Sequence, residues 1–183
     1  MNVQAETRSS SERWYAVWTR SRQEKAVSAR LESLGVAHFL PLHSVERRWS
    51  DRKQVVDLPL FPGYLFAHVD PSSKSKLQVL TTPGVAGFVA NSTGPLPIPD
   101  EEIEWVRRVV QSGAECSPQP MARGGDRVRV LHGPLTGVRG TLLRTGSKSH
   151  LVVSIDLLKR SVSVTVSECD IEPLAVDRAA KGL

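Results

Sequence analysis

The pattern of apolar residues changes abruptly near residue 112, and this change limits how the chain can fold. Before it, segments with helical periodicity alternate with β-branched or aromatic segments. After residue 125 only short strand-like segments follow, separated by Gly-, Ser- or Lys-rich turns. Residues 112–124 contain Pro and Gly and few large apolar residues, as linkers do. The sequence therefore predicts an α+β domain over residues 13–111 and an all-β domain over residues 125–175. Residues 112–124 link the two, and residues 1–12 and 176–183 are expected to be tails.

The first domain shows one strand and two helices clearly. Aromatic and β-branched residues predict a strand over Trp14–Thr19. Ser21 and Glu24 have the spacing of a capping box, and Gly35 supplies a left-handed stop for the helix between them. The apolar face of this helix is expected at Val27, Leu31 and Leu34. A second helix is expected to start at Asp100, with its apolar face at Ile103, Val106 and Val110.

Composition excludes several functional classes. Apolar residues make up 40% of the 183 residues, yet no run approaches the roughly 18–20 needed to span a membrane. The N-terminus lacks an apolar signal segment, and Cys116 and Cys169 form no CxxC pair, so we expect a cytoplasmic protein with no metal. The five His residues show no metal-binding spacing, and no nucleophile or phosphate-loop motif appears. We therefore expect no catalytic residues, no cofactor and no enzyme.

The charge is unevenly distributed. The net charge is +5, and from Arg123 to Arg160 eight Lys/Arg stand against Asp126 and Asp156, a local net charge of +6. Such an excess suits a polyanionic neighbour. Charges that merely solvate a surface are the open alternative.

The segment 61–66 concentrates three of the six Phe and Tyr rings of the chain around Pro62-Gly63. Pro62 fixes φ and Gly63 allows a turn, so a stiff corner can hold Phe61 and Tyr64 outside the register of a strand. Rigid aromatic side chains lose little entropy under a partner and make good interface anchors. We expect both rings to be uncovered for a partner protein; an ordinary core is the alternative.

A basic hairpin is predicted just before this corner, with its turn at Ser50-Asp51. Cations beside a ring suit single-stranded nucleic acid, because they pair with phosphates while the ring stacks on a base. A solvated hairpin is the alternative. The candidate nucleic-acid-binding residues are Arg47, Arg48, Trp49, Arg52 and Lys53, with Arg20 and Arg22 from the first helix's start.

A second docking site is predicted in the C-terminal domain. Leu157 and Leu158 fall where a hairpin turn should be polar, beside Lys159 and Arg160. Exposed apolar residues rimmed by cations mark interaction sites. Ile155 completes this candidate partner-binding group; a core position is its alternative.

Five segments that occur in order between residues 14 and 144 resemble the NusG family of transcription factors. They are "WYAVWTRSRQEKAVSARL", "PLFPGYLFAHV", "TTPGVAGFVA", "PIPDEEIEWV" and "GDRVRVLHGPLTGVRGTLLR", the last of which is similar to the family's KOW motif. The resemblance implies a four-stranded antiparallel sheet with helices, joined to an SH3-like barrel.

The resemblance also implies partners. It places the clamp helices of RNA polymerase's largest subunit against Phe61 and Tyr64, with Trp14 and Tyr15 bordering the pocket. It places the non-template DNA strand near the hairpin. The segment around Leu157 matches the one that contacts ribosomal protein S10 or Rho. The expected protein is a transcription elongation or antitermination factor that suppresses pausing or termination.

Two further expectations concern its type. The stretch 39–66, with its Pro and basic hairpin, looks more like the specialised antitermination paralogs than the general factor. Val162, Val164 and Val166 favour strand, so the barrel should not refold into helices as one specialised member's does. The alternative function is a ribosomal or RNA-processing protein that binds RNA through its KOW barrel.

Overall fold

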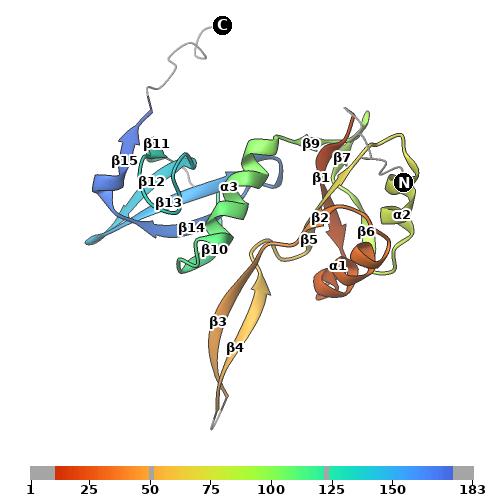
Figure 1. Cartoon of the computed structure of the whole chain (residues 1–183), viewed down its shortest axis with the longest axis horizontal. Helices are drawn as coiled ribbons and strands as arrows, with labels where there is room; N and C mark the ends of the chain where they lie inside the picture. Colours follow the sequence, from red (N-terminus) through yellow and green to blue (C-terminus); the bar gives the residue numbers. More distant parts are fainter. Residues whose placement is uncertain (1–10, 50–51, 122–123, 175–183) are drawn as a thin grey trace, which may run out of the picture. The chain divides into compact units, whose positions relative to one another are not determined.

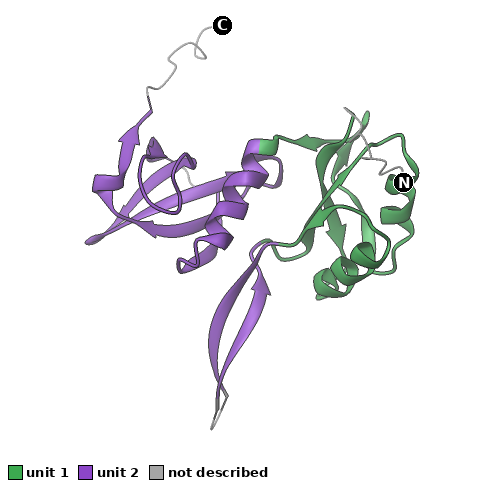
Figure 2. Cartoon of the chain, viewed as in Figure 1, with its two compact units in different colours: residues 1–40, 61–100 green, residues 41–60, 101–183 purple. Residues whose placement is uncertain are grey.

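The computed structural model describes residues 11–49, 52–121 and 124–174. The chain divides into two compact units, residues 1–40 with 61–100 and residues 41–60 with 101–183 (Figure 2). The domain boundaries expected from the sequence stay a prediction, and the expected tails lie almost wholly outside the described residues.

The first unit is built on a five-stranded antiparallel sheet (Figure 1). Strands β2, β5, β1 and β6 are neighbours in that order, and β9 also pairs with β1. The strands are β1 Arg13–Thr19, β2 His38–Phe39, β5 Tyr64–Val69, β6 Val85–Phe88 and β9 Pro97–Ile98. The predicted four-stranded sheet is thus confirmed, with the short β9 added. A small separate hairpin joins β7 Ala90–Asn91 to β8 Gly94–Pro95.

Two helices cover one face of this sheet, α1 Glu24–Ser33 and α2 Lys74–Thr81. Because successive strand residues point to opposite faces, alternate residues of β1 and β5 form the core beneath them. This core contains Tyr15, Val17, Leu65, Ala67 and Val69 from the strands and Val27, Leu31 and Val79 from the helices. The opposite sheet face receives the remaining residues of β1 and β5.

The second unit begins with a long hairpin, β3 Leu42–Trp49 and β4 Arg52–Pro59, whose strands pair only with each other among the described residues. Helix α3, Asp100–Gln111, follows later in the chain and begins where the sequence predicts it. Its buried residues are Ile103, Val106 and Val109. The expected Val110 is only partly buried, because the apolar stripe follows a spacing of three residues at this end.

The C-terminal part is an all-β antiparallel sheet of six strands in the order β10, β14, β13, β12, β11, β15. The strands are β10 Cys116–Pro120, β11 Asp126–Val130, β12 Arg139–Thr145, β13 Lys148–Ile155, β14 Arg160–Val166 and β15 Ile171–Pro173. Short 3-10 turns η1, Asp156–Leu158, and η2, Glu168–Asp170, flank β14. The strand predicted at 162–166 is confirmed.

The structure differs from expectation at three local points. The segment expected to be only a linker contains β10, because its residues pair in register with β14 from Cys116↔Val164 to Pro120↔Arg160. The capping box is absent, because α1 begins at Glu24, two residues later than the box requires, with Gln23 as N-cap and no side-chain cap. Leu34 is the C-cap and is 47% exposed instead of packing on the sheet. Gly35 has φ +68° and ends the helix as expected.

Candidate functional site

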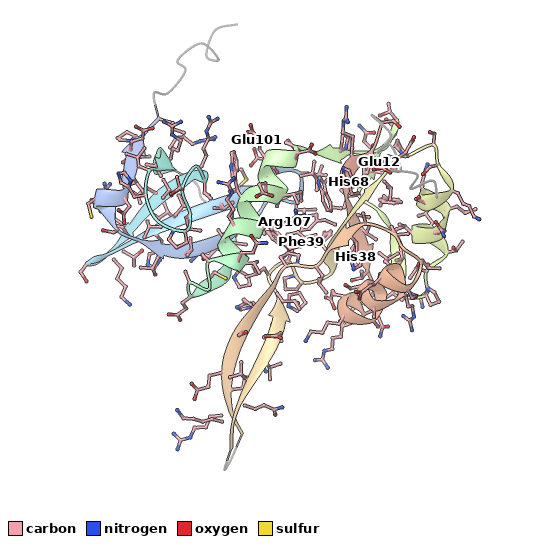
Figure 3. The ribbon with its side chains drawn as sticks, viewed as in Figure 1. Glu12, His38, Phe39, His68, Glu101 and Arg107 are labelled. Carbon is pink, nitrogen blue, oxygen red and sulfur yellow. The ribbon has the colours of Figure 1, made fainter. Side chains whose placement is uncertain are left out.

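The sheet face opposite α1 and α2 is lined by aromatic residues. In the β1–β5 register, Trp14 faces His68, Ala16 faces Phe66 and Trp18 faces Tyr64. Phe39 and Phe61 both contact the ring of Phe66, with centroids 6.4 and 5.5 Å away. We call this set the aromatic face: Trp14, Trp18, Phe39, Phe61, Tyr64 and Phe66. Figure 3 labels Phe39, together with His68 at the Trp14 end of the face.

One end of the aromatic face is open. Trp18 is 56% exposed, the largest exposed ring among the described residues, and it stacks on the partly exposed Tyr64. The two ring centroids are 6.3 Å apart and the planes differ by 15°. A large exposed aromatic pair held in one orientation is the type of surface that partner proteins cover.

Phe61 does not belong to the exposed part, so the expectation that it is uncovered is wrong. Its side chain is fully buried and meets Phe66 edge to face at an interplanar angle of 81°. Of the two rings that flank the Pro62-Gly63 turn, only Tyr64 stays partly exposed. Phe61 therefore acts on any docking surface from beneath, through the position of the corner.

The Pro62-Gly63 corner is fixed from two sides. Gly63 has φ +87°, and its N–H donates to Oε1 of Glu24 on α1 at 2.7 Å. Its carbonyl accepts a hydrogen bond from Thr19 N–H at 2.9 Å. A side chain at position 63 would begin 3.8 Å from Trp18 Nε1, so the exposed ring lies directly over the corner. This arrangement holds the Trp18–Tyr64 pair in place.

The two β1 residues expected to border the docking surface lie on opposite faces of the sheet, because a strand alternates its side chains. Trp14 lies on the aromatic face, 4.9 Å from the ring of His68. Tyr15 points to the other face, where it packs against Phe88, and burial raises the pKa of its hydroxyl. Tyr15 therefore cannot border the docking surface. Sequence reasoning missed Trp18, although its place four residues after Trp14 in a strand puts both rings on one face.

The basic hairpin has two chemically different faces. Residues Ser44, Glu46, Val55 and Lys53 share one face, and there Lys53 Nζ lies 2.7 Å from Glu46 Oε1. Arg47 belongs to the other face, in register with Gln54. Arg47, Arg48 and Lys53 are exposed, and the side chains of Trp49 and Arg52 lie outside the described residues.

Arg20 and Arg22 lie in the turn between β1 and α1, in the first unit, whereas the hairpin belongs to the second. Both are exposed. Arg22 has φ +60°, the left-handed region that side chains rarely adopt. They stay separate candidates for contact with a polyanion.

The candidate partner site in the C-terminal sheet is smaller than expected. Ile155 is fully buried in the core, because it alternates with Leu151 and Val153 along β13. Leu157 and Leu158 are partly exposed on η1, and Lys159 and Arg160 follow them exposed. Lys159 has φ +52°, which reverses the chain into β14. A groove of about 400 Å³ adjoins this turn; Leu60, Pro118–Pro120 and Leu158–Ser161 line it.

Further features of the described part of the chain are its residues of metal-ligating type, the length and apolar character of its helices, and its shifted carboxyl pKa values. The residues described include no group of three or more His, Cys, Asp or Glu that could hold a metal ion. Nor does any helix described have the length and apolar character needed to cross a membrane. The shifted carboxyl pKa values have structural causes: hydrogen bonds from Ser11 and Ser72 lower the pKa of Asp70, and burial raises that of Glu102.

Comparison with known proteins shows which family the chain is similar to. Residues 12–107 match the family model described as transcription termination factor nusG. A transcription termination/antitermination protein NusG from Thermus thermophilus is 33% identical over 147 residues, which cover 70% of this chain and 80% of that one. The Pseudomonas aeruginosa NusG is 28% identical over 174 residues, covering 88% and 98%. A solved structure on domain interaction in Thermotoga maritima NusG shares the fold, with a TM-score of 0.56, 22% identity and coverage of 90% and 98%.

Proposed function

We propose that this chain, which belongs to the NusG family of transcription termination/antitermination factors, binds RNA polymerase through the open end of its aromatic face. Factors of this family are not enzymes, so the function of the chain depends on binding. The proposed contact is with the clamp helices of the polymerase's largest subunit. Binding to one clamp conformation would shift the polymerase toward that conformation and so suppress pausing or termination.

The observation that carries the proposal is the Trp18–Tyr64 pair. Trp18 is 56% exposed and stacks on Tyr64 above a corner that Glu24 and Thr19 hold by hydrogen bonds. A partner that covers these rings buries a large apolar area without having to order them first. An amphipathic helix of the polymerase supplies a suitable apolar stripe.

The test is RNA polymerase binding by wild-type protein and by two variants, Trp18→Ala and Leu77→Ala. Leu77 is 61% exposed on α2, over the opposite sheet face, and serves as the matched control for removing an exposed apolar side chain. Trp18→Ala should lower the affinity by about 2 kcal/mol or more, the usual loss for an interface anchor, which is roughly a thirtyfold change.

Leu77→Ala should bind like wild type, because the sheet and the core beneath α2 separate Leu77 from the aromatic face. Equal affinity of Trp18→Ala and wild type would reject the aromatic face as the docking site. Loss of binding in both variants would mean either that the contact is not confined to the aromatic face or that the variants are misfolded. Circular dichroism of each variant distinguishes these two outcomes.

The hairpin supports a second contact in the same complex, with single-stranded nucleic acid such as the non-template DNA strand. Arg47 and Arg48 are exposed near its tip, and its strands β3 and β4 pair with no other strand among the described residues. Phosphates would be bound by these guanidinium groups. The contact should be lost with rising salt.

The C-terminal sheet is proposed to recruit another protein, ribosomal protein S10 or Rho, near the η1 turn. The partly exposed Leu157 and Leu158 beside Lys159 and Arg160 support this role. We place the protein in the cytoplasm, where polymerase and these partners are found. Its assignment to the specialised paralogs stays a prediction, tested by whether it acts on a few operons or on most transcription units.

A further inference from the structure

The first strand of the C-terminal sheet has an unusual composition for its position. Strand β10 is one of the two outer strands of this sheet and pairs with β14 alone. Two of its five residues are Pro118 and Pro120. Proline has no N–H group, so it is tolerated in a strand only where its nitrogen faces away from a neighbouring strand.

The register shows which way these prolines face. On the other side of β14, Ser154 Oγ and Ser161 Oγ lie 2.9 Å apart across the β13–β14 pair. Side chains approach this closely at pairs whose backbone groups point away from each other. The backbone of Ser161 and of Ser163, two residues on, is therefore directed at β10.

The partners of these serines in β10 are Gln119 and Ser117, which both have N–H groups. Pro118 and Pro120 occupy the alternate positions, opposite Val162 and Arg160, with their nitrogens on the outer edge. The outer edge of β10 thus lacks two donors, and another strand cannot form a regular ladder on it. Any strand that joins the sheet on this side must pair with β14 itself.

Several features make β10 easy to remove. Residues 117–120 are all exposed, and the strand contributes no Leu, Ile, Val or aromatic side chain to the core. Gly113 precedes the strand by three residues and Gly124 follows it by four, with φ of +67° and +95° and free space around both. The β14 residues beneath it, Ser161 to Val164, are by contrast buried.

We propose that β10 is a removable strap on the edge of β14, and that the protein partner docks by replacing it with an extended segment of its own. Such a segment would supply N–H groups to Ser161 and Ser163 and apolar side chains opposite Val162 and Val164. An acidic residue at its end would meet Lys159 and Arg160, which line the adjoining groove. This inference rests on the proposed function, in which the C-terminal sheet recruits a protein.

A disulfide lock tests the strap in the full-length chain. Cys116 faces Val164 in the β10–β14 register, and facing residues of antiparallel strands have Cα atoms about 4.5–5.5 Å apart, within disulfide range. In a Cys169→Ser background, the cysteine introduced by Val164→Cys can therefore form a disulfide with Cys116 on oxidation, which holds β10 in place. Reduction of this disulfide releases the strand. The two redox states of one protein are the matched comparison.

The probe is a synthetic peptide of residues 114–121 that carries Cys116→Ser, Pro118→Val, Pro120→Val and Met121→Glu. A control peptide with Ser117→Pro and Gln119→Pro added lacks the donors that face β14. We expect the probe to shift the amide resonances of Ser161 and Ser163 in the reduced protein, the control peptide not to, and oxidation to weaken probe binding at least tenfold.

Equal probe affinity in the two redox states, or equal binding of probe and control, would overturn the strap. Polymerase binding by the same protein is measured in parallel, since the lock leaves the aromatic face unchanged. Failure of the proposed function appears as no polymerase binding in either state, whereas failure of the strap leaves that binding intact.

Amide exchange in the wild-type chain gives a second measurement that does not depend on the lock. Strap opening exposes the amides of Ser161 and Ser163, while those of Val162 and Val164 stay paired with β13. We expect at least tenfold faster exchange for the two serines. Equal rates for the serine and valine amides would contradict the proposal.

Discussion

The carboxylate of Glu24 accepts a hydrogen bond from the backbone N–H of Gly63, with 2.7 Å between Oε1 and N. This bond joins the first turn of α1 to a corner 39 residues further along the chain. Glu24 is only 7% exposed, so a charged group is held in the interior to fix a single backbone amide. The orientation of the Trp18–Tyr64 pair above the corner depends on this contact.

Replacing Glu24 with Ala should therefore destabilise the fold and loosen the corner. The partly buried N–H of Gly63 would lose a charged acceptor, which costs about 1.5–3 kcal/mol. Urea unfolding measures the loss, and exchange of the Gly63 amide reports the corner directly. Glu24→Gln keeps an acceptor oxygen and should recover part of the stability.

The matched control is Glu32→Ala, an exposed glutamate on the same helix. It should change the free energy of unfolding by less than about 0.5 kcal/mol, as surface substitutions usually do. Equal effects of Glu24→Ala and Glu32→Ala would mean that the bond to Gly63 contributes nothing.

Truncation of Phe61, beside the corner, and of Trp18, on β1, should have opposite effects on stability and on polymerase binding. Phe61→Ala removes a fully buried ring in contact with Phe66 and should cost about 3–5 kcal/mol of stability. Trp18→Ala removes a ring that is mostly exposed and should cost less than about 1 kcal/mol, while it lowers polymerase affinity. Thermal unfolding and polymerase binding, measured on both variants, distinguish a residue that stabilises the fold from one that contacts the partner. A Phe61→Ala protein as stable as wild type would contradict the structural role of Phe61.

The alternation of patterns along the sequence was enough to predict both sheets, α1, α3 and the C-terminal strands. Burial was harder to predict. Phe61 and Tyr64 flank the same Pro-Gly pair, and only the path of the turn decides which ring is covered. Ile155 and Leu157 are likewise two residues apart, but the strand ends between them, so the alternation that buries the first does not extend to the second.

Contacts between distant segments could not be predicted from local patterns. The role of Glu24 at the corner was mistaken for capping, because both roles require an acid near the start of a helix. Strand β10 was missed because prolines indicate a break in structure. On an outer strand, with the nitrogens turned outward, they do not prevent pairing.

The cations of the hairpin should differ in their contribution to nucleic-acid binding. Lys53 is 2.7 Å from Glu46, so a phosphate must compete with this carboxylate, whereas Arg47 lies on the other face of the hairpin. Arg47→Ala should reduce the slope of log affinity against log salt by about 0.7 for single-stranded DNA. Lys53→Ala should reduce it less. The measurement is fluorescence anisotropy with a labelled oligonucleotide at several salt concentrations, and equal slopes for the two variants would contradict it.

The C-terminal sheet should lose stability in acid through Glu168. Hydrogen bonds from Arg144 and Ser149 lower the pKa of this carboxyl in the folded state. A lowered folded pKa means that the stabilisation is fully present above the ordinary pKa of glutamate and is lost as the pH falls through the lowered value. Glu168→Gln should therefore be less stable than wild type at pH 7, and this difference should shrink as the pH falls through the lowered folded pKa. Glu115→Gln, an exposed control, should show no such difference, and a Glu168→Gln deficit that does not shrink with falling pH would exclude ionisation as its cause.

At the Pro62-Gly63 corner, the hydroxyl of Thr19 has no hydrogen-bond partner among the described residues, although the side chain is only 3% exposed. A buried polar atom without a partner costs free energy, and its replacement by an apolar group of the same shape is neutral or stabilising. Thr19→Val should therefore leave the free energy of unfolding unchanged or raise it by about 1 kcal/mol, since the backbone bond from Thr19 to Gly63 is retained. Thr19→Ser keeps the hydroxyl, loses the methyl group and should be less stable than wild type. Urea unfolding compares the three proteins, and a Val variant less stable than wild type would show that the hydroxyl has a favourable interaction at this position.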